Sequence, residues 1–131
     1  MKIHHVGIAV SSLRTSIPIF EKLLGHPPDA EEMVEDQKVR VSVFKVGESR
    51  IELLEATTPD SPIARFIQKR GQGLHHLTLA VPDLKKALGE LEDGGVKLID
   101  RESRTGADNK RVAFLHPSST SGVLIELVET K

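Results

Sequence analysis

The chain has 131 residues, of which 38% are hydrophobic and 28% charged, and its formal net charge is −1. This balance argues against a nucleic-acid or membrane surface, which would need clustered positive charge. Cysteine is absent, so disulfides and thiolate metal sites are excluded, and a transition-metal site must use His, Asp and Glu. No apolar run has the length of a signal peptide or a membrane span, and we expect a cytoplasmic protein.

The first predicted elements are a strand and a helix. Residues 4–10 have the composition of a strand, and the apolar residues after them recur with helical spacing. These apolar residues are Leu13, Ile17, Phe20 and Leu24. Gly25 ends the pattern. Pro18 interrupts it, so we expect the helix either to start late, near Ser16, or to be kinked.

Two strands and a connecting helix are predicted next. Valines alternate with Arg40 and Ser42 over residues 39–43, which indicates a half-buried strand, and a second strand follows over residues 50–54. A connector helix is predicted over residues 61–71, with Ser61 as its N-cap.

The second half of the chain repeats the first. Residues 75–81 match residues 4–10, with four identical positions. Asp83 can cap a following helix that ends at Gly94. Two strands come later, over residues 111–115 and 123–128, and the last one corresponds to the strand Ile51-Glu52-Leu53-Leu54-Glu55. The sequence therefore predicts an α+β fold of two βαβββ modules, about 1–56 and 74–131, within a single domain.

The repeat identifies four candidate site residues. Duplication places equivalent residues about a pseudo-twofold axis, so His5 would approach His76, and Glu52 would approach Glu126. On its strand, His5 shares a face with small residues, while the branched residues occupy the face that packs against a helix. Two imidazoles with carboxylates are a ligand set for Mn, Fe, Co, Ni or Zn. The sequence therefore predicts a metal site.

Each of these residues also has a simpler interpretation. A single His on a strand is more often a core or surface residue than a ligand, and a Glu on an amphipathic strand usually belongs to its solvated face. Because two repeat-related His occur with two repeat-related Glu, we favour the metal site. His4 and His75 are then expected to be structural, with orientation of the ligands as the alternative.

Several segments, in this order, resemble the vicinal oxygen chelate superfamily and, within it, the methylmalonyl-CoA epimerase family. The segments are residues 5–10, 51–55, 60–64, 73–76, 112–117 and 122–127. The resemblance covers nearly the whole chain. It implies a cupped, eight-stranded mixed sheet with helices on the outer face, and a homodimer.

The resemblance also implies a site and a reaction. His5, His76 and Glu126 match the metal ligands of the family, and Glu52 falls where some members have Gln and others Glu. The metal implied is Co²⁺ or Mn²⁺, with Zn²⁺ and Ni²⁺ as alternatives. The substrate would be a CoA thioester, methylmalonyl-CoA, whose C2 epimers interconvert through a metal-stabilised thioester enolate.

Epimerisation requires proton removal from one face of C2 and return to the other, so two acid/base groups are expected. Glu126 is predicted to act on one face, and Glu52, by its symmetry with Glu126, on the other. Some members of the family carry a Glu on the strand at residues 39–46, and this chain has none, so the second base must be another group. Glu48, in the turn before Glu52, is a weaker candidate, and a water could also serve.

Two other functions compete with this one. The first is a glyoxalase-like isomerase or lyase of the same superfamily, and the second is a metal-free protein that binds a small molecule. A loop at residues 103–111 could cover a substrate or be an ordinary surface loop. We expect its basic residues Arg104, Lys110 and Arg111 near the mouth of the second module, where they could meet the CoA phosphates.

Overall fold

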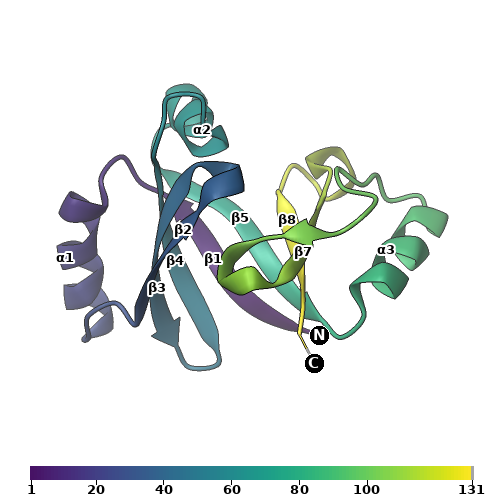
Figure 1. The fold of residues 1–131 in the computed structure, drawn as a ribbon, viewed down its shortest axis with the longest axis horizontal. Helices are drawn as coiled ribbons and strands as arrows, with labels where there is room; N and C mark the ends of the chain where they lie inside the picture. Colours follow the sequence, from purple (N-terminus) through teal and green to yellow (C-terminus); the bar gives the residue numbers. More distant parts are fainter. Residues whose placement is uncertain (131) are drawn as a thin grey trace. The chain divides into compact units, whose positions relative to one another are not determined.

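The computed structural model describes residues 1–130, so Lys131, the expected end of the second module, lies outside the described residues. Figure 1 shows the elements in chain order. The first half contains β1 (Lys2–Ala9), α1 (Leu13–Leu24), β2 (Ala30–Val34), β3 (Val39–Val46) and β4 (Ser49–Ala56). The helix α2 (Pro62–Arg70) follows. The second half contains β5 (Gly73–Val81), α3 (Leu84–Asp93), β6 (Arg104–Thr105), β7 (Arg111–Leu115) and β8 (Ile125–Glu129).

The chain divides into two compact units, and the same topology occurs in both. Residues 5–75 form one unit, and residues from 76 onward, together with residues 1–4, form the other. In the first unit the strands lie in the order β2-β3-β4-β1, with only β1 and β4 parallel. In the second the order is β6-β7-β8-β5, with only β5 and β8 parallel. The predicted α+β fold, with two βαβββ modules and eight strands in a mixed sheet, is confirmed.

Two edge strands were not predicted from the sequence. β2 contains two adjacent glutamates, and β6 has only two residues, so neither shows the alternating apolar pattern of a strand. They form because β3 and β7 offer unpaired backbone groups along one side. The predicted loop at residues 103–111 therefore contains β6 and a 3-10 turn, Ala107–Asn109.

Helix α1 begins at Leu13, so the predicted late start near Ser16 is wrong. The Ser12 hydroxyl accepts a hydrogen bond from the Thr15 N–H (3.3 Å), and the Glu55 carboxylate accepts one from the Leu13 N–H (3.3 Å). Two acceptors on the first turn and the burial of Leu13 stabilise this start. Pro18 lies on the exposed side, where its ring does not disturb the packing against the sheet.

Helix α3 starts in the same way and confirms the predicted Asp83 cap. The Asp83 carboxylate accepts a hydrogen bond from the Lys86 N–H (3.0 Å), and the Glu129 carboxylate accepts one from the Leu84 N–H (3.0 Å). Glu129 occupies the repeat position of Glu55. The last Glu of each terminal strand therefore anchors the helix of its own module, a role that strand periodicity did not indicate.

Both faces of β3 are buried over residues 41–44, which corrects the prediction of a half-buried strand at Ser42, while Arg40 is exposed as expected. Val41 and Val43 pack with Leu54 and with Ile63 of α2 on one face. On the other, α1 covers Phe44 with a set of apolar side chains. Ser42 alternates with Phe44 along β3 and so faces the same side, and 0% of its surface is exposed. The helix buries a position that the sequence pattern assigns to solvent.

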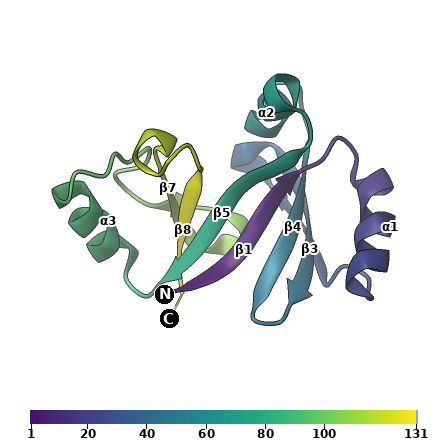
Figure 2. The same cartoon turned by 180° about the vertical axis from the view of Figure 1, so that it is seen from behind.

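In the second unit, α3 lies beside β7 and β8 (Figure 2). Its Leu84 and Leu88 pack against Ala113, Leu115 and Leu127. The opposite face of the sheet carries Thr78 and its register partner Glu126, together with His76. Along the described part of the chain, no helix is both long and apolar enough to cross a membrane.

The predicted connector helix is observed as α2, with Ser61 as its N-cap. The Ser61 hydroxyl accepts a hydrogen bond from the Ile63 N–H (3.2 Å) and donates one to the Gln37 carbonyl (3.1 Å). This hydroxyl joins the start of α2 to the turn between β2 and β3.

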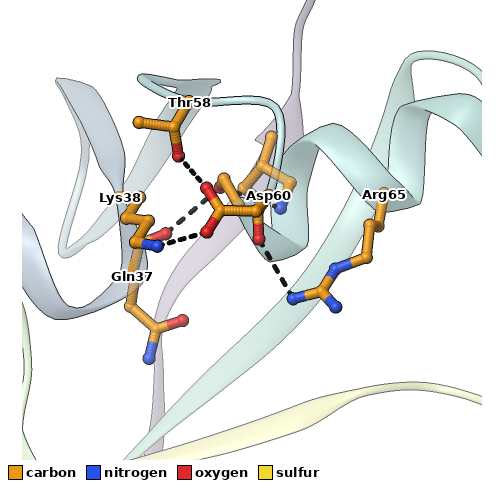
Figure 3. A network of polar contacts seen from close by, with 7 residues as sticks. Gln37, Lys38, Thr58, Asp60 and Arg65 are labelled. Carbon is orange, nitrogen blue, oxygen red and sulfur yellow. Dashed lines mark hydrogen bonds and ion pairs between the residues drawn. The ribbon is translucent and has the colours of Figure 1, made fainter.

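Asp60 strengthens the same junction (Figure 3). Its carboxylate is paired with the Lys38 ammonium and accepts a hydrogen bond from the Thr58 hydroxyl (2.5 Å). Its backbone carbonyl accepts a hydrogen bond from Arg65 (3.1 Å). The Lys38 and Thr58 hydrogen bonds lower the pKa of Asp60 to about 2. The carboxylate is ionised at neutral pH and pairs with Lys38 just before the start of α2.

Candidate functional site

The first unit carries a buried His–carboxylate pair on neighbouring strands. His5 lies on β1 and Glu52 on β4, and the register places Gly7 beside Glu52. The distance from His5 Nδ1 to Glu52 Oε2 is 3.4 Å. The exposed fractions are 6% for His5 and 5% for Glu52. Val43, on β3, lies directly opposite Glu52 on its other side.

The second unit carries the equivalent pair. His76 lies on β5 and Glu126 on β8, and the distance from His76 Nε2 to Glu126 Oε1 is 3.5 Å. Thr78 lies beside Glu126 in the register, and its hydroxyl donates a hydrogen bond of 2.6 Å to Glu126 Oε1. Phe114, on β7, is directly opposite Glu126. Each unit thus holds one predicted His and one predicted Glu together.

Burial decides between the two interpretations of the glutamates. A Glu on the solvated face of an amphipathic strand would be exposed, whereas both Glu52 and Glu126 are buried. The register places small or medium-sized neighbours beside them: Gly7 beside Glu52, and Thr78 beside Glu126. The solvated-face interpretation is wrong for both residues.

The donor atoms of each pair suit a metal ion. Two ligand atoms about 2.1 Å from one metal ion, at an angle of about 90° to 110°, lie roughly 3.0–3.4 Å apart. The N···O distances of 3.4 Å and 3.5 Å in the two pairs are close to this separation. Imidazole and carboxylate groups are also ligands that divalent transition metals accept. Each pair can therefore contribute two ligands to a divalent metal.

The electrostatic environment of Glu126 is unusual. Burial raises its pKa to about 7, although the Thr78 hydrogen bond and the Arg104 charge both act to lower it. The nearby Asp100 acts in the same direction as burial. A carboxyl group with a pKa near neutral pH can both accept and return a proton. A bound cation would instead favour its ionised form.

Three residues near Glu126 were not assigned a role from the sequence: Thr78, Phe114 and Asp100. A fourth, Arg104, was expected only to meet the CoA phosphates. The Phe114 ring stands edge-on to the His76 ring, with 6.1 Å between centroids. The Arg104 guanidinium lies over the Phe114 ring, 5.3 Å from its centroid. Asp100 accepts a hydrogen bond from the Phe114 N–H (2.8 Å). Thr78 could have been found by strand parity, whereas the others depend on a register that the sequence does not specify.

The basic residues of the 103–111 segment separate onto two faces. Arg104 pairs with Val112, and Thr105 pairs with Arg111, so Arg104 and Arg111 face opposite sides of the hairpin. Arg111 donates a hydrogen bond from Nε to the Ser103 hydroxyl (2.7 Å). Arg104 is therefore on the Glu126 side and Arg111 on the other side. The expected proximity of Arg104, Lys110 and Arg111 to the CoA phosphates stays a prediction.

His75 has the packing of a structural residue. Its ring stands edge-on to Phe66, with 4.9 Å between centroids, and burial lowers its pKa to about 4. It is therefore neutral at pH 7. This packing supports the structural role expected for His75, while the role of His4 stays a prediction.

The comparisons with known proteins agree with this arrangement. A family model described as "Glyoxalase/Bleomycin resistance protein/Dioxygenase superfamily" matches residues 4–114. The chain belongs to this superfamily. The uncharacterized protein YqjC of Bacillus subtilis is 44% identical over 130 residues, which cover 99% of this chain and 93% of that protein.

Solved structures narrow the assignment. The methylmalonyl-CoA epimerase of Mycobacterium tuberculosis is 37% identical, with a TM-score of 0.93, over 99% of this chain and 88% of that one. A variant of the Streptomyces coelicolor methylmalonyl-CoA epimerase, in complex with 2-nitronate-propionyl-CoA, is 32% identical, with a TM-score of 0.94. That match covers 99% of this chain and 94% of the other. The chain is thus a member of the methylmalonyl-CoA epimerase family and an isomerase, and the predicted resemblance is confirmed.

Proposed function

We propose that this protein is a metal-dependent epimerase that interconverts the C2 epimers of methylmalonyl-CoA. The observation that carries the proposal is the duplicated, buried His–carboxylate pair, one member of which has a pKa of about 7. The names of the solved relatives, and the CoA thioester analogue in one of them, support the substrate.

The proposed metal ligands are His5, His76, Glu126 and Glu52, which would act together on one divalent cation. The support is the internal repeat and the ligand-like spacing within each pair. The absence of cysteine leaves nitrogen and oxygen ligands only. We propose Co²⁺ as the metal, with Mn²⁺ as the next candidate and Zn²⁺ or Ni²⁺ after it. When bound, the metal would supply a Lewis acid for the thioester and carboxylate oxygens of the substrate.

The protein groups supply the proton transfers. Glu126 is proposed to remove or return the C2 proton on one face, because it is a buried carboxyl group beside His76. The Thr78 hydroxyl restrains this carboxylate through a short hydrogen bond. Glu52 is proposed to serve the opposite face, since it is buried beside the equivalent His of the other module.

Exchange of the C2 proton with deuterated solvent tests the reaction directly. We expect the protein, supplied with Co²⁺ or Mn²⁺, to incorporate deuterium at C2 of methylmalonyl-CoA and to interconvert its epimers. Absence of exchange at high enzyme concentration would defeat the epimerase proposal. The hemithioacetal of methylglyoxal and glutathione, assayed in parallel, tests the glyoxalase-like alternative.

The proposal also covers domain organisation, oligomeric state and location. We propose one folding domain, a homodimeric state and a cytoplasmic location, in line with the internal repeat and the family resemblance. A single cooperative unfolding transition would support one domain. Light scattering after size-exclusion chromatography would show whether the protein has the mass of two chains.

A further inference from the structure

Arg104 shares a face of the second module with the proposed acid/base group. The register aligns Arg104 with Val112, and Val112 with Val128. Residues that are paired across strands project to the same face, and alternate residues of one strand do so too. Val128 and Glu126 are alternate residues of β8, so Arg104 and Glu126 project to the same face.

The guanidinium of Arg104 is held in place from two sides. Its Cζ lies 5.3 Å from the centroid of the Phe114 ring, and Phe114 is directly opposite Glu126 in the register. Its Nε is 3.6 Å from Asp100 Oδ2, a carboxylate oxygen that also accepts the Phe114 N–H. Aromatic stacking and one carboxylate therefore orient the group near Glu126.

In this orientation, the Arg104 guanidinium can still donate hydrogen bonds to a ligand. At 3.6 Å, the Asp100 contact is longer than a hydrogen bond, and 42% of the Arg104 side chain is exposed. In the described part of the chain, the Arg104 side chain pairs with Asp100, lies over the Phe114 ring and interacts electrostatically with Glu126. A guanidinium has five N–H donors in a planar fork that matches a carboxylate.

We propose that Arg104 binds the free carboxylate of the acyl group and thereby selects 2-carboxyacyl thioesters over simple acyl thioesters. The inference rests on the proposed function, since it names how that site recognises its substrate. C2 bears both the exchangeable proton and the carboxylate carbon. A group that binds the carboxylate must therefore lie beside the base that removes the proton. Arg104 meets this requirement, whereas a CoA phosphate is many bonds away from C2.

The experiment compares two ligands on three proteins. Isobutyryl-CoA differs from methylmalonyl-CoA in having a methyl group in place of the carboxylate. Binding of both is measured by calorimetry with wild type, Arg104→Met and Arg111→Met, all loaded with Co²⁺. Arg111 is the matched control, because it has the same charge on the same hairpin but faces the opposite side. Melting temperatures establish that each variant is folded.

We expect Arg104→Met to weaken methylmalonyl-CoA binding by about 10- to 100-fold, the range of a charge-assisted hydrogen bond. Isobutyryl-CoA binding should change less than about twofold. Arg111→Met should leave the preference for methylmalonyl-CoA unchanged, because both ligands contain the same CoA. Arg104→Lys should recover part of the loss, because it restores the charge without the fork.

The inference is overturned if Arg104→Met weakens the binding of both ligands equally or weakens the binding of neither. It is also overturned if the wild-type protein does not bind methylmalonyl-CoA more tightly than isobutyryl-CoA. These results are separable from failure of the proposed function. An enzyme that exchanges the C2 proton while Arg104→Met binds methylmalonyl-CoA normally refutes only the role of Arg104. An enzyme that binds with the expected preference but never exchanges the proton refutes the epimerase proposal.

Discussion

The two modules have the same scaffold, but the residues around their glutamates differ. In the first module, Glu52 has Gly7 on one side and Val43 on the other. In the second, the equivalent neighbours of Glu126 are Thr78 and Phe114. At these matching positions, the second module has the hydroxyl-bearing Thr78 where the first has Gly7. It has the aromatic Phe114 where the first has the aliphatic Val43.

The edge strands extend this difference. In the second module, Arg104 pairs with Val112. The equivalent of Val112 in the first module is Val41, and the residue that pairs with Val41 is Glu32. The repeat therefore places opposite charges at equivalent positions. Duplication preserved the His–carboxylate pairs, while the surroundings diverged. We infer that the second module supplies substrate recognition and a tuned acid/base group, and that the first supplies ligands and the partner base.

The largest expected effect comes from removing one base from either module. Glu126→Gln and Glu52→Gln should each reduce epimerisation by about 10²- to 10⁴-fold, the usual contribution of a general acid or base. Each variant should still exchange the C2 proton of one epimer, because one face keeps its base. Chiral separation of the products, with deuterium content by mass spectrometry, measures both effects. Full epimerisation by Glu52→Gln would assign the second base elsewhere.

The next effect concerns the metal. If both modules hold one cation, His5→Ala and His76→Ala should each weaken Co²⁺ binding by about 100-fold or more, at the upper end of what a supporting residue contributes. Wild type should bind one Co²⁺ per chain in a titration followed by elemental analysis. Two independent sites would give two ions per chain, with one retained in each variant. Normal metal content in His76→Ala would refute the ligand assignment.

A third prediction uses the pKa of Glu126 in the metal-free protein. Its folded-state pKa of about 7 exceeds the ordinary value of 4.5, so ionisation destabilises the fold as pH rises through this range. Metal-free Glu126→Gln should therefore be more stable than wild type by about 3 kcal/mol at pH 8 and by almost nothing at pH 4. Urea unfolding at several pH values measures the difference. Glu90→Gln, an exposed control on α3, should show none.

The smallest effect should come from the hydroxyl of Thr78, whose equivalent in the first module is Gly7. Thr78→Val removes a hydrogen bond that favours ionised Glu126, so the pKa of Glu126 should rise further, by about one unit. The pH dependence of unfolding of the metal-free protein should shift accordingly. Thr105→Val, on the opposite face, is the control. An unchanged profile would show that the hydroxyl does not distinguish the two glutamates.

The sequence by itself determined the repeat and its main structural consequences. Local patterns predicted the βαβββ order, the Asp83 and Ser61 caps and the two faces of β1 and β5, because these depend on residues close in the chain. The repeat also selected Glu52 and Glu126, since repetition separates a shared role from ordinary amphipathic patterning.

Tertiary structure decided the features that depend on distant neighbours. Ser42 is buried because α1 covers it, and α1 begins at Leu13 because Glu55, far along the chain, accepts its first N–H. Arg104 joins the Glu126 side because a two-residue strand pairs in one register, and a shift by one residue would have reversed its face. Register, burial and long-range hydrogen bonds are set by elements that meet only in the folded chain, and these determine how the two modules differ.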